Sequence, residues 1–410
     1  MALPGKARTL IIVENLPCPF DRRVWQEALS LHANGYEVSI ICPKGRGHDS
    51  SYELLDGVHI YRHPLPVEAD SAWTYGLEYS LSLLMEFGLA VRVALTRGFD
   101  VIHGCNPPDT IFLIGRFFKL FGKRFIFDHH DINPELYEAK FGRRDRWYRL
   151  LCWLEKRTFA AADVSIATNE SYRRIAIDRG GMAPSRVFVV RSGADLTRVR
   201  VLTPREELRR GKRYLIGYVG VIGKQEGLDL LLESVAYIRS SLGRDDIHFT
   251  IVGDGTELPA LRHLSRQLGV DACVEFTGRI PDQNLWEIMS TADVCVNPDR
   301  ANEMNDKSTM NKILEYMALG KPIVQFDLTE GRFSAGESSL YARANDTTDF
   351  GNKVCELLDD PARRTRMGAI GRQRVESGLA WHHQVPRLLE AYATALNLDR
   401  PAAKSVNNEV

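Results

Sequence analysis

The residues best suited to chemistry in this chain lie in one stretch, residues 302–325, which reads NEMNDKSTMNKILEYMALGKPIVQ. Its polar first part disfavours a helix, and Ser308 or Thr309 can then cap the start of one. Apolar residues at helical spacing follow, before a glycine, a proline and a buried strand. The helix N-terminus offers N–H groups and a positive dipole end, which suit a phosphate. Glu315, one or two turns inward, can accept from hydroxyls beside it; the alternative is an ordinary surface helix.

The composition indicates a soluble protein with more than one domain. With 410 residues the chain is too long for one ordinary domain, so we expect two. A hydrophobic content of 44% and a charged content of 26% are typical of globular proteins. The formal net charge is zero, which gives no support for a nucleic-acid partner. Cations exceed anions slightly in the first half, and much of that excess lies between Arg116 and Arg157.

Cysteine usage and hydropathy favour a cytoplasmic protein. The seven cysteines are scattered, odd in number and free of any C-x-x-C pair, which indicates a reducing compartment and no structural zinc. The first residues lack the apolar core of a signal peptide. The longest helical candidate, Trp73–Thr96, carries the charged residues Glu78, Glu86 and Arg92, which argues against a membrane span.

Strand and helix patterns alternate in two series along the chain. The first series runs from the strand Thr9–Val13 to the strand Val187–Val190, a polar and basic linker follows, and the second series begins at Leu215. This rhythm predicts an α/β protein of two doubly wound, Rossmann-like domains that face each other across a ligand-binding cleft. The expected divisions are a first domain over residues 1–198, a second over 199–384, a helix over 385–398 that packs back on the first, and a disordered tail over 399–410.

An ordered set of motifs resembles glycosyltransferase family 4. In the second half these are GYVGVIGKQEGLDLLLES, FTIVGDGTELPALRHLSRQLG, VEFTGRIPDQNLWEIMSTADVCVNP and KILEYMALGKPIV; in the first half they are RRVWQEALSLHANGYEVSIICP, DVIHGCNPP, FIFDHHDINPE and VVRSGADL. The resemblance spans Leu10 to Leu396. It implies a GT-B fold and a retaining enzyme that uses a nucleotide sugar. Within the family the chain looks most like bacterial enzymes that build O-antigen, capsule or exopolysaccharide on a polyprenyl-diphosphate carrier.

The resemblance implies a donor site in the second domain. Glu315 falls on the family's late glutamate, which holds the ribose hydroxyls. Backbone N–H groups of residues 309–311 are implied to meet the diphosphate, and the turn Gly278-Arg279-Ile280 to meet the base. Gly253-Asp254-Gly255 is a tight turn on the phosphate side, or simply a β–α connection. The expected donor-binding residues are Gly220, Lys224, Gly253, Asp254, Gly255, Gly278, Arg279, Ile280, Ser308, Thr309, Met310, Asn311, Lys312 and Glu315.

In the first domain, DHHD resembles the Asp-x-His-Asp/Glu motif that the family carries at the end of a strand. It implies that His130 lies beside the transferred sugar, with Asp131 and Glu135 nearby. Strand alternation points His129 the other way, where a buried packing role is favoured. His103, Asn106 and Glu135 are expected on the acceptor side, although a core role is as good for His103. The family needs no metal for catalysis, and no third ligand has suitable spacing, so neither metal nor cofactor is expected.

The chain departs from the family pattern where the diphosphate is held. Lys307 replaces the earlier glutamate of the motif, and Val221 and Glu226 replace an arginine and a lysine. Charge develops on the departing phosphate, so a cation is still needed. Our hypothesis is that Lys307, helped by Lys224 and Lys312, supplies it. We therefore expect Lys307 to act in catalysis with His130 and Asp131.

Two stretches that mix cations with aromatic residues predict contact with a membrane. These are Phe117–Phe125, FFKLFGKRF, and Arg143–Arg157, RRDRWYRLLCWLEKR. Such a patch suits an anionic lipid surface and a lipid-linked acceptor. The alternative is helix packing with a solvated basic face. The expected location is the cytoplasmic face of the cell membrane.

These observations predict a hexosyl- or N-acetylhexosaminyltransferase that moves a sugar from a UDP-sugar to a lipid-linked saccharide. A GDP-sugar donor or a soluble acceptor is the alternative within this class. A GT-B nucleotide-sugar 2-epimerase is more distant, because its catalytic carboxylates are not recognisable. A non-catalytic nucleotide-sugar-binding partner is suggested only by the altered residues 221, 226 and 307. The sequence does not specify the sugar, the linkage, the acceptor or the oligomeric state.

Overall fold

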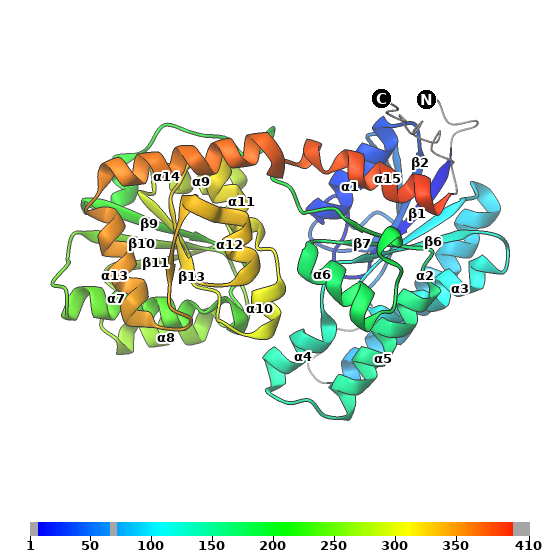
Figure 1. The fold of residues 1–410 in the computed structure, drawn as a ribbon, viewed down its shortest axis with the longest axis horizontal. Coiled ribbons are helices and arrows are strands. Elements are labelled where there is room, and N and C mark those ends of the chain that lie inside the picture. The colour runs from blue at the N-terminus through cyan, green and yellow to red at the C-terminus, as the bar shows by residue number, and fades with distance from the viewer. Residues whose placement is uncertain (1–6, 66–71, 397–410) are drawn as a thin grey trace, which may run out of the picture. The chain divides into compact units, whose positions relative to one another are not determined.

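A computed structural model describes residues 7–65 and 72–396 of the chain. Contacts divide the chain into two compact units (Figure 1). The first unit takes residues 1–138, 143–190 and 385–410, and the second takes residues 139–142 and 191–384, each within its described part. The division after Val190 lies slightly before the expected one at residue 198. The expected disordered tail falls outside the described residues.

The first unit contains an eight-stranded sheet in the order β3-β4-β2-β1-β5-β6-β7-β8. All neighbours pair in parallel except β3, which pairs antiparallel with β4 at the edge. The strands are β1 Arg8–Ile12, β2 Glu37–Pro43, β3 Tyr52–Leu55, β4 Val58–His63, β5 Val101–Cys105, β6 Arg124–His129, β7 Val164–Ala167 and β8 Val187–Val189. The strand β3 was not predicted.

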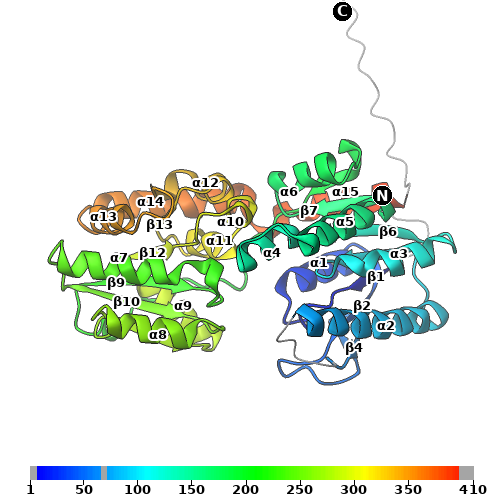
Figure 2. The ribbon, with the colours of Figure 1, turned by 90° about the horizontal axis from the view of Figure 1, so that it is seen from below.

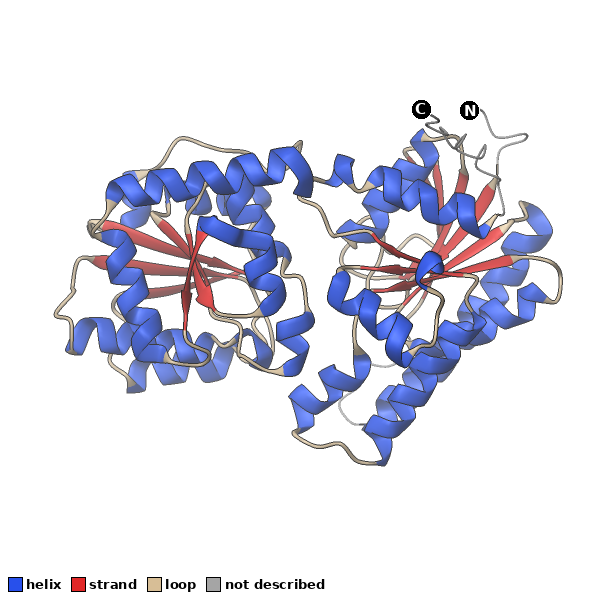
Figure 3. Ribbon diagram, viewed as in Figure 1, coloured by secondary structure: helices blue, strands red, loops and turns tan. Residues whose placement is uncertain are grey.

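Helices cover both faces of this sheet (Figure 3). They are α1 Arg22–Ala33, α2 Ala72–Thr96, α3 Phe112–Lys119, α4 Asn133–Phe141, α5 Arg146–Ala161, α6 Glu170–Arg174 and α15 Val385–Ala395. Asp21 caps α1 by accepting from the Val24 N–H, as its position before an apolar run predicts. A 3₁₀ turn at Asp109–Ile111 precedes α3.

The second unit contains a six-stranded parallel sheet in the order β11-β10-β9-β12-β13-β14. Its strands are β9 Tyr214–Val219, β10 Ile247–Val252, β11 Val274–Gly278, β12 Val294–Asn297, β13 Ile323–Phe326 and β14 Ser339–Ala342. Its helices are α7 Leu228–Ser240, α8 Leu258–Gln267, α9 Asp282–Thr291, α10 Glu303–Lys307, α11 Asn311–Ala318, α12 Thr329–Ala335, α13 Thr347–Leu358 and α14 Pro361–Arg374. The outward numbering from β9 on both sides is the order of a doubly wound fold.

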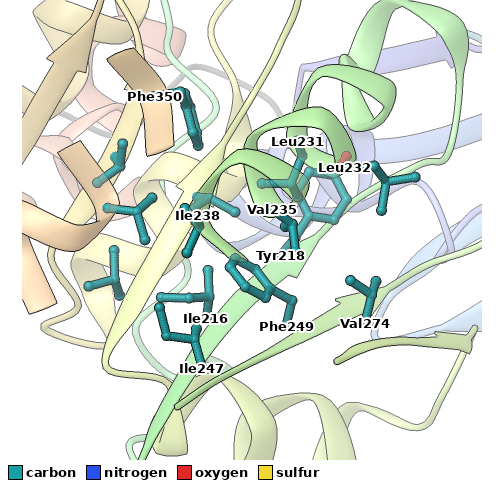
Figure 4. Close-up of a cluster of buried hydrophobic side chains, with 14 of the residues drawn as sticks. Ile216, Tyr218, Leu231, Leu232, Val235, Ile238, Ile247, Phe249, Val274 and Phe350 are labelled. Atoms are coloured by element: carbon teal, nitrogen blue, oxygen red, sulfur yellow. The ribbon is translucent and has the colours of Figure 1, made fainter. Parts of the chain in front are cut away.

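An apolar core fixes the sheet of the second unit against its helices. Tyr218 and Phe249 from the strands pack beside Leu231 and Val235 of α7, and Phe350 of α13 closes the other side (Figure 4). All are at most 2% exposed. Burial of each such side chain contributes about 1.5–3 kcal/mol. The loops at the carboxyl ends of these strands are therefore held on a rigid support.

Two details of the opening stretch differ from expectation. Residues 303–307, predicted as a loop, form the short helix α10, because the Asn302 side chain accepts from the Asn305 N–H and caps it. The next helix, α11, has Met310 as its N-cap without a side-chain hydrogen bond, so neither Ser308 nor Thr309 caps it.

Candidate functional site

In the first unit, the end of β6 places a buried carboxylate next to His130. His130 Nε2 lies 2.5 Å from Asp128 Oδ2. The Arg23 guanidinium, from α1, donates to Asp128 Oδ1 at 3.0 Å and lies 3.1 Å from Glu27 Oε1. Asp128 and Glu27 are fully buried, whereas the His130 side chain keeps 14% of its surface exposed. The histidine is thus anchored on one side and accessible on the other.

Charges within this group set its protonation. Burial disfavours the charged form of His130, but Asp128 outweighs it and raises the pKa of the imidazole. Burial likewise opposes ionisation of Asp128, yet Arg23 and His130 hold its pKa well below the ordinary value. Burial and the charge of Asp128 raise the pKa of Glu27 to about 8. The group therefore shifts His130 towards its protonated form and Asp128 towards its ionised form.

Other expected residues of the first unit brace this pair. His103, in the middle of β5, is fully buried; its Nδ1 lies 2.9 Å from the Tyr392 hydroxyl and its Nε2 lies 3.2 Å from Asp128 Oδ2. Tyr392 belongs to α15, and its hydroxyl also lies 3.2 Å from Thr9 Oγ1. These contacts favour a core role for His103 over an acceptor contact.

Asn106 fixes the turn that carries His130 and Asp131. Its Oδ1 accepts from the backbone N–H groups of His130 at 2.7 Å and Asp131 at 3.1 Å, and its Nδ2 donates to the Asp131 carbonyl at 2.6 Å. Asn106 is 2% exposed. Burial raises the pKa of its partner Asp109 to about 7. Asn106 is thus a positioning residue for His130 and Asp131.

His129 and Glu135 enter a separate ionic network. His129 points away from His130, as strand alternation predicts, and its Nε2 lies 3.3 Å from Glu155 Oε1. Arg179 donates to both oxygens of Glu135, at 2.7 and 3.1 Å, and to both oxygens of Glu155. Since its carboxylate is occupied by Arg179, Glu135 is better described as structural than as an acceptor contact.

In the second unit, three glycine-bearing loops join at the carboxyl ends of β9, β10 and β11. The Gly220 N–H donates to the Val252 carbonyl, and the Gly253 N–H donates to the Gly278 carbonyl, both at 3.1 Å. Gly253 has φ of +145°, and a Cβ there would lie 1.8 Å from the Gly220 carbonyl oxygen. Only glycine permits this approach of the two backbones. The structure therefore brings Gly220, Gly253 and Gly278 together, with Asp254 and Gly255 in the same turn.

The helix α11 begins beside these loops. The Tyr316 hydroxyl accepts from the Val219 N–H at 2.9 Å, which fixes α11 against the end of β9. Thr309, Met310 and Asn311 lead into the helix, and Glu315 lies one turn further on the same face as Asn311. The N-terminal turn and Glu315 thus lie on one face of α11, and their contact with a diphosphate and a ribose stays a prediction.

Lys312 occupies the place beside Gly220. Its Cε lies 3.3 Å from where a Gly220 Cβ would stand, and its Nζ lies 2.6 Å from Glu226 Oε2 and 2.8 Å from Asp299 Oδ1. Lys312 is 8% exposed. Burial disfavours its charge, but the two carboxylates raise its pKa well above the ordinary value. Burial raises the pKa of Asp299 to about 7 in spite of Lys312. Glu226, which replaces a family lysine, thus meets a lysine from α11.

The other expected cations are more exposed to solvent than Lys312. Lys307 Nζ pairs with Glu303 Oε1 at 2.5 Å within α10, and Lys224 and Arg279 are exposed. Val221 is 63% exposed. These placements neither confirm nor contradict a role for Lys307, which stays a prediction.

Sequence reasoning missed Arg191 and Arg23. Arg191 is buried, its Nη1 lies 3.3 Å from Glu330 Oε2 and 3.5 Å from Thr309 Oγ1, and its guanidinium stands 4.0 Å from the Phe333 ring centre. It brings a cation to the loop before α11. The sequence contains a weak indication of both, because Arg191 lies within the motif VVRSGADL and Arg23 within the motif RRVWQEALSL.

Among the described residues of the first unit, two groups have ligand atoms close enough for a metal. They are His103, Cys105 and Asp128, and Glu27, Asp128 and His130, each within 4.8 Å. Arg23 already places a cation against Asp128 and Glu27. That charge opposes a second cation, and the expectation of no metal stays a prediction.

Comparisons with known proteins identify two glycosyltransferase domains. The model described as Glycosyltransferase Family 4 matches residues 21–198, and Glycosyl transferases group 1 matches residues 213–360. A D-inositol 3-phosphate glycosyltransferase of Thermomonospora curvata is 30% identical over 62% of each chain. A GDP-mannose-dependent monoacylated alpha-(1-6)-phosphatidylinositol monomannoside mannosyltransferase of Corynebacterium glutamicum is 27% identical over 48% of this chain and 53% of its own.

The chain thus spans about half to three fifths of the length of these curated relatives. Among solved structures, the sucrose-phosphate synthase of Thermosynechococcus elongatus matches with a TM-score of 0.75, at 17% identity, over 96% of this chain and 100% of its own. That likeness identifies the GT-B fold. The two family models lie one on each doubly wound unit, in the order that the motifs predict. The chain thus carries two glycosyltransferase domains, one of Glycosyltransferase Family 4 in its first half and one of Glycosyl transferases group 1 in its second.

Proposed function

We propose that this chain is a retaining glycosyltransferase that moves a sugar from a nucleotide sugar to a lipid-linked saccharide. The proposal is supported by the arrangement of the second unit. The loops of Gly220 and Gly253 meet beside the start of α11, and Glu315 follows one turn later. A helix N-terminus suits a diphosphate, and a carboxylate accepts from a vicinal diol. The expected donor is a UDP-sugar.

The proposed reaction needs a stabilised leaving group more than a strong base. In retaining transfer the acceptor hydroxyl attacks the face from which the diphosphate departs, so the diphosphate itself can take the proton. Charge on the departing oxygen is met by the helix dipole and by nearby cations such as Lys312 and Arg191. His130, held by Asp128, orients the sugar rather than acting as the main base. Neither a metal nor a cofactor enters this scheme.

A surface of the first unit supports the proposed membrane contact. We define the α2–α3–α5 surface by its exposed apolar residues, Leu81, Leu84, Leu113, Phe117, Leu120, Phe121, Leu150 and Trp153. Phe87 of α2 and Phe117 of α3 stack edge to face at 4.8 Å, and α3 lies next to α5 (Figure 2). Exposed Arg116, Arg149 and Arg157 lie on the same helices. Phe118 and Phe125, expected in this patch, are core residues instead.

This combination suits the surface of an anionic membrane, where apolar side chains enter the headgroup region and cations meet the phosphates. Within the described residues, no helix has the length and apolarity to cross a bilayer. The proposed location is the cytoplasmic face of the membrane, and the proposed acceptor is carried by a polyprenyl diphosphate in surface polysaccharide synthesis.

A GDP-sugar donor is the second candidate. The relative from Corynebacterium glutamicum bears a name that specifies GDP-mannose and a phosphatidylinositol acceptor. The Gly278-Arg279-Ile280 turn is expected to contact the base through backbone atoms, which accept different bases with little change. Donor choice therefore needs a direct measurement.

Calorimetry with UDP, GDP, ADP and their common sugars tests the proposal. We expect saturable binding of a uridine species that Glu315→Ala abolishes. Glu233→Ala, an exposed glutamate on α7, is the matched control and should leave affinity unchanged. Binding of guanosine species alone would favour a GDP-sugar donor over a UDP-sugar donor. Absence of binding to every nucleotide would favour the non-catalytic alternative and reject the proposal.

A further inference from the structure

A cluster of buried polar side chains lies at the carboxyl edge of the first unit's sheet, on strands other than β6. Glu14 follows β1 and His63 ends β4, while Ser82 and Glu86 stand one turn apart on α2, which packs against β2 and β4. Their exposures are 4%, 2%, 0% and 0%. In open α/β sheets, ligands bind outside the carboxyl ends of the strands. We call these four residues the Glu86 cluster.

Polar atoms of this cluster lack hydrogen-bond partners among the residues that the structure describes. They are both carboxylate oxygens of Glu86, Ser82 Oγ and His63 Nε2. His63 Nδ1 lies 3.0 Å from the Pro64 carbonyl oxygen, so Nδ1 carries the proton of the neutral ring and Nε2 is left as an acceptor. The distance from His63 Nε2 to Glu86 Oε1 is 3.9 Å, too long for a hydrogen bond. A small polar atom between them can bond to both.

Such a cluster works against stability. Buried polar groups in folded proteins are almost always hydrogen-bonded, and each one left unsatisfied carries a desolvation penalty. Glu155, buried in the same unit, shows the usual solution, because Arg179 and His129 contact its carboxylate. Burial, and then the charge of Glu14, raises the pKa of Glu86 well above its usual range. Buried groups whose pKa is strongly shifted cluster at functional sites.

The chemistry of the cluster selects a neutral ligand. His63 Nε2 accepts, the Ser82 hydroxyl donates and accepts, and a protonated Glu86 does both, which matches a set of alcohol groups. The charge of the neighbouring Glu14 repels an anion. The neighbouring Arg62 side chain emerges on the other side of the strand, where it donates to Glu53 and the Cys18 carbonyl, so it does not bring a cation to the cluster.

We propose that His63, Ser82 and Glu86 form a binding site for hydroxyl groups of a neutral sugar or cyclitol ring. The claim that this site holds the acceptor's ring rests on the proposed function. The claim that it binds hydroxyl groups does not depend on that function. The cluster lies on the same sheet edge as His130, because β4, β1 and β6 are parallel strands of one sheet. It accounts for polar atoms that the donor chemistry leaves unused.

Saturation-transfer NMR on the full chain tests the site with defined probes. These are the methyl glycosides of glucose, galactose and mannose, and myo-inositol, at millimolar concentration. We expect saturation transfer to at least one probe, and its loss in Glu86→Leu and in His63→Ala. Glu37→Leu is the matched control, because Glu37 is exposed at the opposite end of the same sheet, and should keep the signal. Silence from every probe with the unmodified chain, or signals that persist in both variants, would overturn the proposal.

Thermal unfolding separates a binding role from a structural one. If Glu86 is retained for a ligand, Glu86→Leu removes an unsatisfied buried acid and should leave the melting temperature unchanged or raise it. If Glu86 holds the fold together, the melting temperature must fall, and that result would refute the proposal. Ser82→Ala should behave as Glu86→Leu does and remains informative if the latter fails to fold. Nucleotide binding, measured separately, should be the same in all variants; its absence in the unmodified chain would count only against the proposed function.

Discussion

Lys312 and Lys307 stand five residues apart, and their surroundings predict different consequences of removing each charge. Lys312→Ala leaves the buried Asp299 and the half-buried Glu226 without their shared cation. Breaking a buried ion pair from one side costs about 3–5 kcal/mol, so we expect the free energy of unfolding to fall by about that amount. Lys307→Ala removes an exposed pair with Glu303 and should change it by less than about 1 kcal/mol. Urea denaturation of both variants measures this difference.

The catalytic hypothesis for Lys307 needs a separate readout, because stability does not report on the leaving group. Lys353→Ala is the matched control: it too removes an exposed helix pair, with Glu356 at 2.8 Å. We expect Lys307→Ala to lower kcat for sugar transfer by about tenfold or more, equivalent to about 1.4 kcal/mol of transition-state stabilisation. Equal rates in the two variants would remove Lys307 from the mechanism and leave Lys312 and Arg191 as the nearby cations.

Glu27 predicts how stability depends on pH. Its pKa is about 8 in the folded chain against an ordinary value of 4.5, so between these values the folded state holds a proton that the unfolded state has released. Stability from this group is therefore complete below about pH 4.5 and is lost as pH rises towards 8, by at most about 1.4 kcal/mol per pH unit. Glu27→Gln should flatten this part of the profile, measured by urea denaturation at several pH values.

Neighbouring charges define the control for that measurement. Arg23, Asp128, His103 and His130 face Glu27 from α1, β6, β5 and the turn after β6. The raised pKa of His130 acts in the same direction above its ordinary value of 6.5, so a weaker slope should remain in Glu27→Gln. Glu37→Gln, which alters an exposed carboxylate, should reproduce the unmodified profile. An identical slope in Glu27→Gln would show that this carboxyl is already ionised in the folded chain.

At the scale of elements, the contact between the Gly220 and Gly253 loops makes a prediction about the donor site. Gly253→Ala places a Cβ on the Gly220 carbonyl oxygen at a φ that disfavours any side chain. We expect the loops to separate, with loss of nucleotide affinity of at least tenfold by calorimetry. Gly378→Ala is the control, since nothing lies within 4 Å of its added Cβ and its φ is not in the left-handed region. Unchanged affinity in Gly253→Ala would mean that these loops do not contact the nucleotide.

Strong apolar periodicity made most elements predictable. The strands from β1 to β8 and from β9 to β13 include apolar runs such as TLIIV and FTIVG. Such runs predict a buried strand from the local sequence alone. The edge strand β3 was missed because its residues are exposed or half-buried and lack that pattern. The helix α10 was missed because one cap, Asn302, outweighs the low helix propensity of Asn305 and Asp306.

The site was predictable only where a motif carried it. The glycine turns, Glu315 and His130 follow from local sequence and resemblance. The pairing of Lys312 with Glu226 joins residues 86 positions apart, and no spacing rule reveals such a charge exchange. The same holds for Tyr392, which comes from α15 to contact His103 at a separation of 289 residues. Contacts of this kind are set by tertiary packing, which periodicity does not encode.

At the scale of the whole molecule, the exposed apolar residues are distributed unevenly between the units. Leu84, Leu120 and Phe121 on the α2–α3–α5 surface are 67%, 81% and 64% exposed. Large apolar patches of this kind mark interaction sites, and the cations on the same helices specify an anionic partner. We expect the full chain to bind vesicles that contain phosphatidylglycerol, and to bind less as salt rises, because surface charges are screened.

A matched pair of double variants locates that binding on the chain. Leu120→Ser with Phe121→Ser should weaken vesicle affinity by about tenfold or more, since each apolar side chain that enters the interface contributes about 1–2 kcal/mol. Val201→Ser with Leu242→Ser removes exposed apolar residues of the second unit, at 62% and 37% exposure, and should leave affinity unchanged. Vesicle sedimentation at low salt measures both. If the unmodified chain does not sediment with anionic vesicles under these conditions, the proposal of a lipid-linked acceptor loses its structural support. A soluble acceptor, with the donor site unchanged, then becomes the favoured hypothesis.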